Sequence, residues 1–453
     1  MTQTVQPVKH RLFSNTDLRN LIIPLIIQQL LTVLIGMVDT MMVATVGEAA
    51  VSGISLVDSV NILLIQFFGA MATGGAVISA QYLGGKERDK ACAAAKQLLY
   101  ISVFLALAVA GVALIGGQRL LRFIFGSIED DVMANARTYF WLSALSYPFL
   151  AVYNAGAALF RSMSDSKISM KLSLLANVVN VAGNAILIYG CSMGVAGAGI
   201  ATLLSRASAA VIVVWLLRNK HNPIFIEKLL SYRFDWKMVK SILHIGVPNG
   251  LENGMFQVGK VLVSSLIARF GTAAITANAI ATNFASFECI PGTAIGLAMI
   301  TVIGQCVGAR DYEQARYYAK KMMGITYACM TGISILLMLV CKPVALLYNP
   351  SAETLSLTIW CAVYHSINCI ITWPMAFALP NVLRAASDVK FTMVTSIITM
   401  WTCRILLSYV LALGLGLQLK GVWIAMTLDW VVRGGLFLWR FLSGKWEKAH
   451  AAA

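Results

Sequence analysis

The chain has 453 residues, of which 58% are hydrophobic and only 12% are charged. Soluble domains carry about 25% charged residues, so this composition excludes a soluble enzyme, a disordered protein and a disulfide scaffold. The net charge of +15 requires no nucleic acid partner, because membrane proteins retain Lys and Arg in their cytoplasmic loops. We therefore predict an integral membrane protein that lies in the lipid bilayer.

The predicted elements are apolar runs long enough to cross a bilayer, for which a helix needs about 20 residues. In chain order they occupy residues 21–45, 52–80, 97–117, 136–160, 172–190, 197–218, 242–268, 273–303, 321–342, 354–382, 392–413 and 420–442. None has the short alternating pattern of a barrel strand. The predicted fold class is an all-α integral membrane protein with twelve transmembrane helices.

Basic residues are distributed unevenly over the predicted connections. If the N terminus is cytoplasmic, 25 Lys and Arg residues lie on that side and six on the other. This asymmetry follows the positive-inside rule. We expect a multi-pass membrane protein with both termini in the cytoplasm.

An internal repeat relates the two halves of the sequence. Adding 224 to residue numbers 24–96 aligns them without a gap to 248–320, and Gln81 then falls on Gln305. Because each half contains an even number of predicted helices, both halves have the same orientation, which is one of the known transporter architectures. We expect two six-helix lobes joined by a linker: an N-lobe at 1–218, a cytoplasmic linker at 219–241 and a C-lobe at 242–453.

One carboxylate lies inside the first apolar run. Ionisable groups within such runs are costly and usually face a cavity or a partner. Asp39 shares one helical face with three earlier residues, namely Gln28, Thr32 and Gly36. It could exchange a proton, or hold a partly dehydrated Na⁺. The fifth run adds a polar stripe that could supply further ligands or only bond neighbouring helices: Ser173, Asn177, Asn180 and Asn184.

The second half carries its own polar face on the seventh apolar run. Glu252 and Lys260 are too far apart along a helix to pair directly. Lys260 could neutralise Glu288 on the next run, or take the place of a bound cation. The residues we predict around a substrate cavity are Gln28, Thr32, Gly36, Glu252, Asn253, Gln257, Lys260, Glu288 and Trp373.

Several other polar groups have local explanations. Asp429 and Arg433 are four residues apart and should satisfy each other. We expect Asp58 to be in water and His365 to be a hydrogen-bonded core residue. Arg206 and Arg404 either extend to the membrane surface or bond polar neighbours. The sequence leaves both possibilities open.

The nine cysteines are scattered through apolar segments without a CxxC pair. We saw no histidine at a metal-ligand spacing from them and interpret them as reduced packing residues. We therefore predict no metal centre, apart from a Na⁺ ion at Asp39, and no cofactor. An intramembrane hydrolase would need an aspartate pair, an HExxH motif or a Ser/His pair, and we found none, so we predict that the protein is not an enzyme.

Several motifs together resemble the multidrug and toxic compound extrusion (MATE) transporters over nearly the whole chain. They include Val38-Asp39-Thr40, Gln81-Tyr-Leu-Gly-Gly85, Arg161-Ser-Met-Ser-Asp165, Asn180-xxx-Asn184 and Leu383-Arg-Ala-Ala-Ser-Asp388. The resemblance implies a V-shaped pair of lobes, cation-coupled antiport and export of cationic, amphipathic compounds.

The resemblance also implies roles for individual residues. Asp39 matches the family's first-helix carboxylate, Asn180 and Asn184 match its polar pair on the fifth helix, Thr202 matches a threonine on the sixth, and Asn154 is a looser match on the fourth. With Asn177 from the polar stripe, these residues make up the predicted cation-coupling set. Phe256 and Trp373 stand where many relatives have acidic Na⁺ ligands. This departure favours coupling through Asp39.

We therefore expect an antiporter that exports small organic cations in exchange for H⁺ or Na⁺ and acts as a monomer. A lipid-linked glycan flippase of the same superfamily is the alternative within transport. A non-transporting membrane receptor is the alternative outside it.

Overall fold

The computed structural model describes residues 11–126, 129–227 and 234–451, and these residues form helices without any strand. The N-terminal half contains α1 (Asn15–Ala44), α2 (Glu48–Gly84), α3 (Arg88–Phe125), α4 (Asp130–Ser162), α5 (Ser166–Asn184), the π-helix η1 (Ala185–Gly190) and α6 (Gly194–Leu217). The C-terminal half contains α7 (Trp236–Ala268), α8 (Thr272–Glu288), α9 (Ile290–Gly308), α10 (Tyr312–Leu346), α11 (Ala352–Ile371), η2 (Pro374–Ala378), α12 (Pro380–Ala385), α13 (Val389–Thr399), η3 (Met400–Leu406), α14 (Leu407–Tyr409), η4 (Val410–Gly414), α15 (Gln418–Leu442) and α16 (Lys445–Ala451).

Each predicted apolar run is helical, which confirms the all-α membrane class. Ten helices in the described ranges are long and apolar enough to cross a membrane. The helices α4 and α7 have 33 residues each but fall outside that set of ten. Both still pack within the bundle, α4 against α2 and α6, and α7 against α2.

Two predicted spans are interrupted. The run at 273–303 is divided at Cys289, which separates α8 from α9, and Pro291 lies in the first turn of α9. The run at 354–382 is divided after α11, and Pro374 begins η2. Proline lacks the backbone N–H that would continue the preceding helix, so both interruptions have a local cause.

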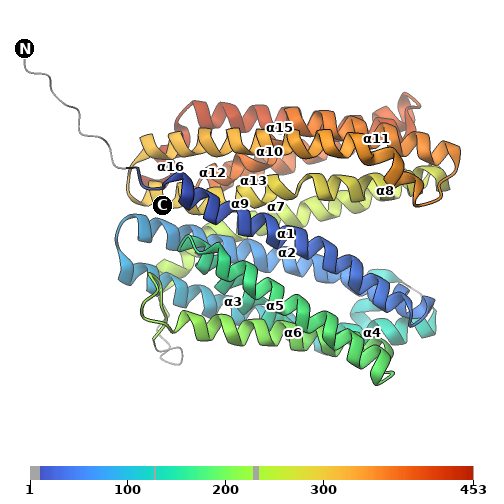
Figure 1. Ribbon diagram of the computed structural model, residues 1–453, viewed down its shortest axis with the longest axis horizontal. Helices are drawn as coiled ribbons and strands as arrows, with labels where there is room; N and C mark the ends of the chain where they lie inside the picture. Colours follow the sequence, from blue (N-terminus) through green and yellow to red (C-terminus); the bar gives the residue numbers. More distant parts are fainter. Residues whose placement is uncertain (1–10, 127–128, 228–233, 452–453) are drawn as a thin grey trace, which may run out of the picture.

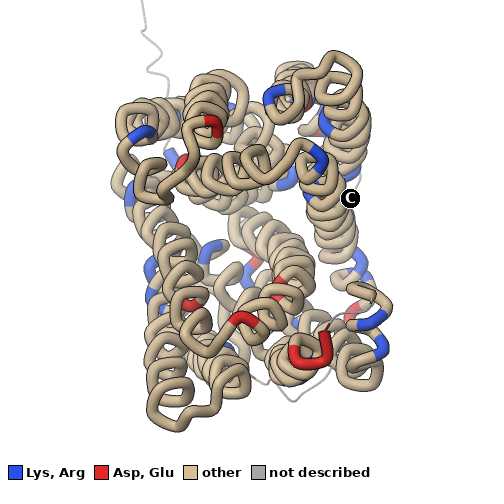
Figure 2. Tube along the Cα trace, turned by 90° about the vertical axis from the view of Figure 1, so that its right-hand side faces the viewer, with Lys and Arg blue, Asp and Glu red and all other residues tan. Residues whose placement is uncertain are grey.

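The helices form the two lobes that the repeat predicts (Figure 1). The N-lobe contains α1 to α6 and the C-lobe contains α7 to α15. At the end of the molecule that carries α16 the lobes lie close together, because α2 packs on both α7 and α9. Toward the opposite end the helices of the two lobes diverge, and Figure 2 views the molecule from that end.

We call the end where the lobes meet the closed end. There α2 and α9 approach backbone to backbone at equivalent positions of the repeat. A Cβ on Gly84 would lie 1.9 Å from the Gln305 carbonyl oxygen, and a Cβ on Gly308 would lie 1.8 Å from the Gln81 carbonyl oxygen. Only glycine allows so close an approach.

Candidate functional site

A cavity of about 380 Å³ lies inside the N-lobe, between α1, α2, α4, α5 and α6. It gathers polar residues from helices that are far apart in the sequence. The predicted residues that line it are Thr32, Gly36, Asp39, Asn177, Asn180, Asn184 and Thr202. Gln28 and Asn154 are not among the lining residues. Gln28 instead accepts a hydrogen bond from Ser169 over 3.0 Å.

Asp39 lies in the last turns of α1, toward the diverging end. Asn184 donates to its Oδ1 over 2.8 Å. The Asn180 amide also faces the carboxyl group, and with its nitrogen turned toward Asp39 it donates over 2.6 Å to Oδ1 and 2.9 Å to Oδ2. With its oxygen turned toward Asp39, the amide can only accept a hydrogen bond, which requires a proton on the carboxyl group.

The amides lie side by side because the residues that carry them share one face of α5. Asn177, Asn180 and Asn184 are three and four residues apart, so they share one face of the helix. The π-helix η1 begins immediately after Asn184, and such wider turns occur frequently at functional sites.

Several polar atoms of this region lack a hydrogen-bond partner. They are the buried Asn184 Oδ1, Asn177 Nδ2 and Asn154 Nδ2. Buried polar groups are normally satisfied. These atoms are therefore available to a water molecule, an ion or a substrate.

Two charged members of the cavity were not predicted from the sequence. We expected Asp58 to be in water, but it lines the cavity and accepts a hydrogen bond from Asn61 over 3.1 Å. Arg206 also lines the cavity and donates to Ser146 over 2.7 Å. Arg206 follows Thr202 by one helical turn on α6, and this spacing could have indicated it.

The charged groups of the C-lobe are arranged differently. Glu252 accepts from Arg384 over 2.7 Å, and it also accepts from Ser396 over 2.7 Å. The prediction that Asp429 pairs with Arg433 is confirmed by two bonds of 3.0 and 2.9 Å. Two other candidates, Asn253 and Gln257, are half-buried on α7.

Lys260 does not neutralise Glu288, contrary to one of our sequence expectations. Its Nζ lies 5.2 Å from the centre of the Phe256 ring, and the guanidinium carbon of Arg404 lies 5.0 Å from the same centre. These are cation–π distances. Within the described ranges, neither cation has a carboxylate at ion-pair distance.

Glu288 instead pairs with a histidine. It is 1% exposed, and its Oε2 lies 2.6 Å from His365 Nδ1. Ser334 donates to the other carboxylate oxygen. The remaining candidate, Trp373, is 6% exposed and stacks on Phe377, so it belongs to the packed core of the C-lobe.

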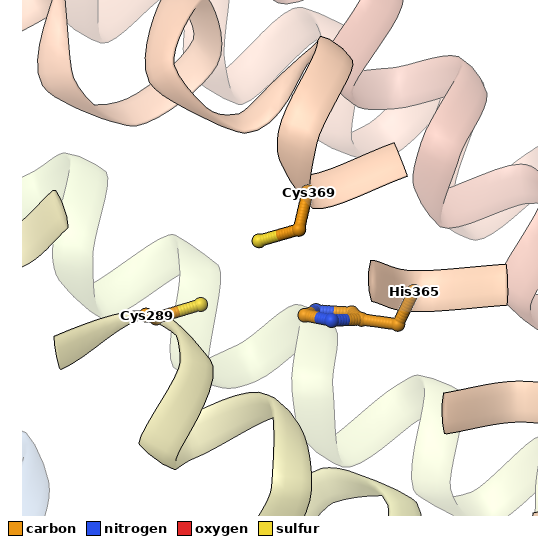
Figure 3. Close-up of side chains that lie close together, drawn as sticks. All are labelled: Cys289, His365 and Cys369. Atoms are coloured by element: carbon orange, nitrogen blue, oxygen red, sulfur yellow. The ribbon is translucent and has the colours of Figure 1, made fainter. Parts of the chain in front are cut away.

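All nine cysteines are free, as we expected, but two of them lie beside a histidine. Cys289, His365 and Cys369 lie together, with one potential ligand atom from each within 4.8 Å of the others (Figure 3). His365 and Cys369 are four residues apart on α11. We overlooked this spacing in the sequence, whereas the approach of Cys289 depends on the fold.

Two parallel six-helix lobes, an internal repeat and an intramembrane carboxylate in a polar cavity define a membrane transporter. The model of the MatE family matches the chain twice, over residues 24–186 and 248–410. These stretches are offset by the same 224 residues as the internal repeat. The chain therefore belongs to the MatE family, whose members are transporters rather than enzymes.

Individual relatives resemble the chain over almost its full length. It is 26% identical over 435 residues to the uncharacterized transporter YisQ of Bacillus subtilis, covering 93% of each chain. It is 26% identical over 443 residues to the probable multidrug resistance protein NorM of Thermotoga maritima, covering 95% of this chain and 93% of the relative.

Solved structures share the fold. One described as the outward-facing conformation of a multidrug resistance MATE family transporter superposes with a TM-score of 0.89 at 20% identity, covering 95% of this chain and 96% of that one. Another, of a MATE protein in the bent conformation, superposes with a TM-score of 0.88 at 19% identity, covering 96% and 97%.

Proposed function

We propose that this chain is a secondary active multidrug efflux antiporter of a bacterial inner membrane. It exports cationic, amphipathic compounds in exchange for H⁺ or Na⁺ by alternating access of its two lobes, works as a monomer and has both termini in the cytoplasm. The observation that carries the proposal is Asp39, which lies in a membrane-embedded cavity with two amides against its carboxyl group.

The Asn180 amide carries both a donor and an acceptor, so it can hydrogen-bond Asp39 in either charge state of the carboxyl group. When Asp39 is ionised, Asn180 and Asn184 both donate to it. When Asp39 carries a proton, the carboxyl group donates to the Asn180 oxygen, and Asn180 in turn donates to Thr202 over 3.3 Å. The Asn180 amide can therefore hydrogen-bond the carboxyl group in either charge state, so Asp39 can gain or lose a proton without losing this contact.

A Na⁺ ion would use the same atoms differently. Hard cations prefer oxygen ligands, and the carboxylate of Asp39 contacts the amides of Asn180 and Asn184, each of which carries an oxygen. The Asn184 oxygen lacks a hydrogen-bond partner. The proposal therefore includes both ions and assigns them the same binding site at Asp39.

The lobes are closed at the end that carries the start of α1 and α16, and this supports a cycle in which the cavity is loaded from outside. With the termini in the cytoplasm, the closed end faces inward and the cavity is loaded from outside. H⁺ or Na⁺ then binds at Asp39 and the compound leaves. The loaded carrier turns inward and releases the ion.

An efflux assay tests this proposal. The chain, expressed in a host that lacks its own efflux pumps, should lower ethidium accumulation, and an uncoupler or removal of Na⁺ should abolish the effect. Asp39→Asn should abolish it at normal expression. Asp131→Asn, at an exposed carboxylate in the first turn of α4, is the matched control and should keep it. Undiminished efflux by Asp39→Asn would exclude this coupling site.

We infer a second candidate function from the C-lobe: transport of a compound that bears an anionic group, such as a lipid-linked glycan. Lys260 and Arg404 flank the Phe256 ring without an ion-pair partner in the described ranges, and such a pair suits a carboxylate or phosphate. In a competition assay, Lys260→Gln should weaken inhibition of efflux by an anionic analogue and leave inhibition by a cationic analogue unchanged. Equal effects on both would exclude this second candidate.

A further inference from the structure

The C-lobe contains a cluster of soft ligands away from the cavity described above. Cys289, His365 and Cys369 each offer an atom within 4.8 Å of the others (Figure 3). Bonds from Zn²⁺ to sulfur and nitrogen are about 2.0 to 2.3 Å long. Around a tetrahedral ion with such bonds, neighbouring ligand atoms lie about 3.3 to 3.8 Å apart. Rotation of the two cysteine side chains can bring the three atoms from within 4.8 Å to this spacing.

The positions of these residues follow from the course of the helices. Cys289 occupies the single position between α8 and α9, ahead of Pro291. His365 and Cys369 are one turn apart on α11, so both face that break. An ion held by all three would tie α11 to the interruption of the eighth predicted span.

His365 is oriented in the manner of a metal-binding histidine. Its Nδ1 faces the Glu288 carboxylate at 2.6 Å, and Ser334 holds the other carboxylate oxygen. A proton on Nδ1, donated to this carboxylate, would leave the lone pair of Nε2 for an ion. Histidine ligands of metals almost always have such a carboxylate or carbonyl partner on the second nitrogen.

Aromatic rings fix the histidine further. Its ring meets Trp423 and Trp430 edge to face, with centroids 5.7 and 5.2 Å away. The imidazole is therefore held in one orientation before any ion arrives, and this lowers the entropic cost of binding.

We propose that Cys289, His365 and Cys369 form a binding site for a thiophilic transition-metal ion, of the class of Zn²⁺ and Cu⁺. Thiolate and imidazole ligands select such ions over Na⁺ or Mg²⁺. For a divalent ion, two cysteine thiolates supply the opposite charge when they release their protons on binding. This matters because Cys369 is fully buried and His365 is 4% exposed. The proposal does not depend on what the chain transports.

Spectroscopic titration with Cd²⁺ tests the site directly. The full-length protein, purified in detergent with a phosphine reductant, should bind one equivalent of Cd²⁺ with a sulfur-to-metal charge-transfer band, and Zn²⁺ should displace it. Cys289→Ser and Cys369→Ser should each lose most of the band. Glu288→Gln should weaken binding by about 10- to 100-fold while keeping the band, since only the orienting group is changed.

The matched control is Cys361→Ser. Cys361 lies on the same helix and is as fully buried as Cys369, at 0% exposure, yet it is outside the cluster. This variant should bind Cd²⁺ like the unmodified protein. Absence of a thiolate band in the unmodified protein overturns the proposal, whether or not any variant folds. An equal loss of the band in Cys361→Ser, or its persistence in the Cys289→Ser/Cys369→Ser double variant, also overturns it.

Discussion

Gln81 and Gln305 occupy equivalent positions in the two halves of the chain and make equivalent hydrogen bonds to the opposite lobe. Gln81 Nε2 donates to the Ala385 carbonyl over 2.8 Å, and Gln305 Nε2 donates to the Ser162 carbonyl over 2.8 Å. The internal repeat is therefore expressed as a reciprocal contact at the closed end.

Each glutamine also donates a hydrogen bond to a serine hydroxyl in the turn that follows its carbonyl acceptor. Gln81 donates to Ser387 over 3.2 Å, and Gln305 donates to Ser164 over 3.3 Å. Both serines have a left-handed backbone, with φ of 66° and 65°. These contacts must break if the closed end opens, so they set part of the free energy of closure.

Replacing these glutamines should weaken the closed end. Each buried hydrogen bond contributes about 1 kcal/mol, and an acceptor left unsatisfied costs more. Gln81→Leu and Gln305→Leu should each shift the lobes toward the open arrangement by a similar amount, and the double variant should add to that shift. Distances between spin labels on the two lobes measure this change. Unequal effects of the two single variants would contradict the symmetry of the contact.

The glycines at the crossing of α2 and α9 provide a steric test. Gly308→Val should prevent closure and abolish cycling, because the added Cβ alone would lie 1.8 Å from a backbone oxygen. Gly332→Val on α10 is the control, since a Cβ at that position would have no other atom within 4 Å. Transport in proteoliposomes measures both. If Gly308→Val cycles normally, the closed end is not required for transport.

The Asn180 amide should govern exchange at Asp39 in both charge states. Asn180→Leu removes both the donor and the acceptor that face the carboxyl group, so it should slow coupled transport at least about tenfold if one hydrogen bond of about 1.4 kcal/mol is lost from the rate-limiting state. Asn368→Leu on α11, whose amide bonds its own helix, is the control. Flux of a fluorescent cation gives the rate, and an unchanged rate in Asn180→Leu would remove this amide from the mechanism.

The buried pair in the C-lobe should be important for stability. Glu288→Leu leaves His365 without its partner in a buried position, and breaking such a pair costs about 3 to 5 kcal/mol. The double variant Glu288→Leu/His365→Leu should recover much of the loss, because no buried polar group is then left unpaired. Thermal unfolding in detergent distinguishes the two. A double variant that is less stable than Glu288→Leu would show that packing dominates over pairing.

The helices were predictable from the sequence because a membrane span leaves a long apolar run. The interruptions at Cys289 and Thr372 were not predicted, because apolar residues continue on both sides of each one. Pro291 and Pro374 were the available signals. The repeat at an offset of 224 was visible because it requires no gap.

The residues that line the N-lobe cavity were predictable where helical spacing alone groups them, as for Asn180 and Asn184. The position of Asp58 in the lining of the N-lobe cavity was not predicted, because only packing turns α2 toward that cavity. The contact between Glu288 and His365 joins residues 77 positions apart, and no local pattern encodes such a distance. Partners that are distant in the sequence therefore required the structure, whereas the pair of Asp429 and Arg433, four residues apart, did not.

Ion flux driven by a drug gradient, in proteoliposomes with pH and Na⁺ varied separately, tests the role of Asp39 most directly. We predict that the unmodified protein moves H⁺ or Na⁺ against the drug, and that Asp39→Asn moves neither ion while still binding the drug. Ion flux through Asp39→Asn at the unmodified rate would contradict coupling at this carboxylate.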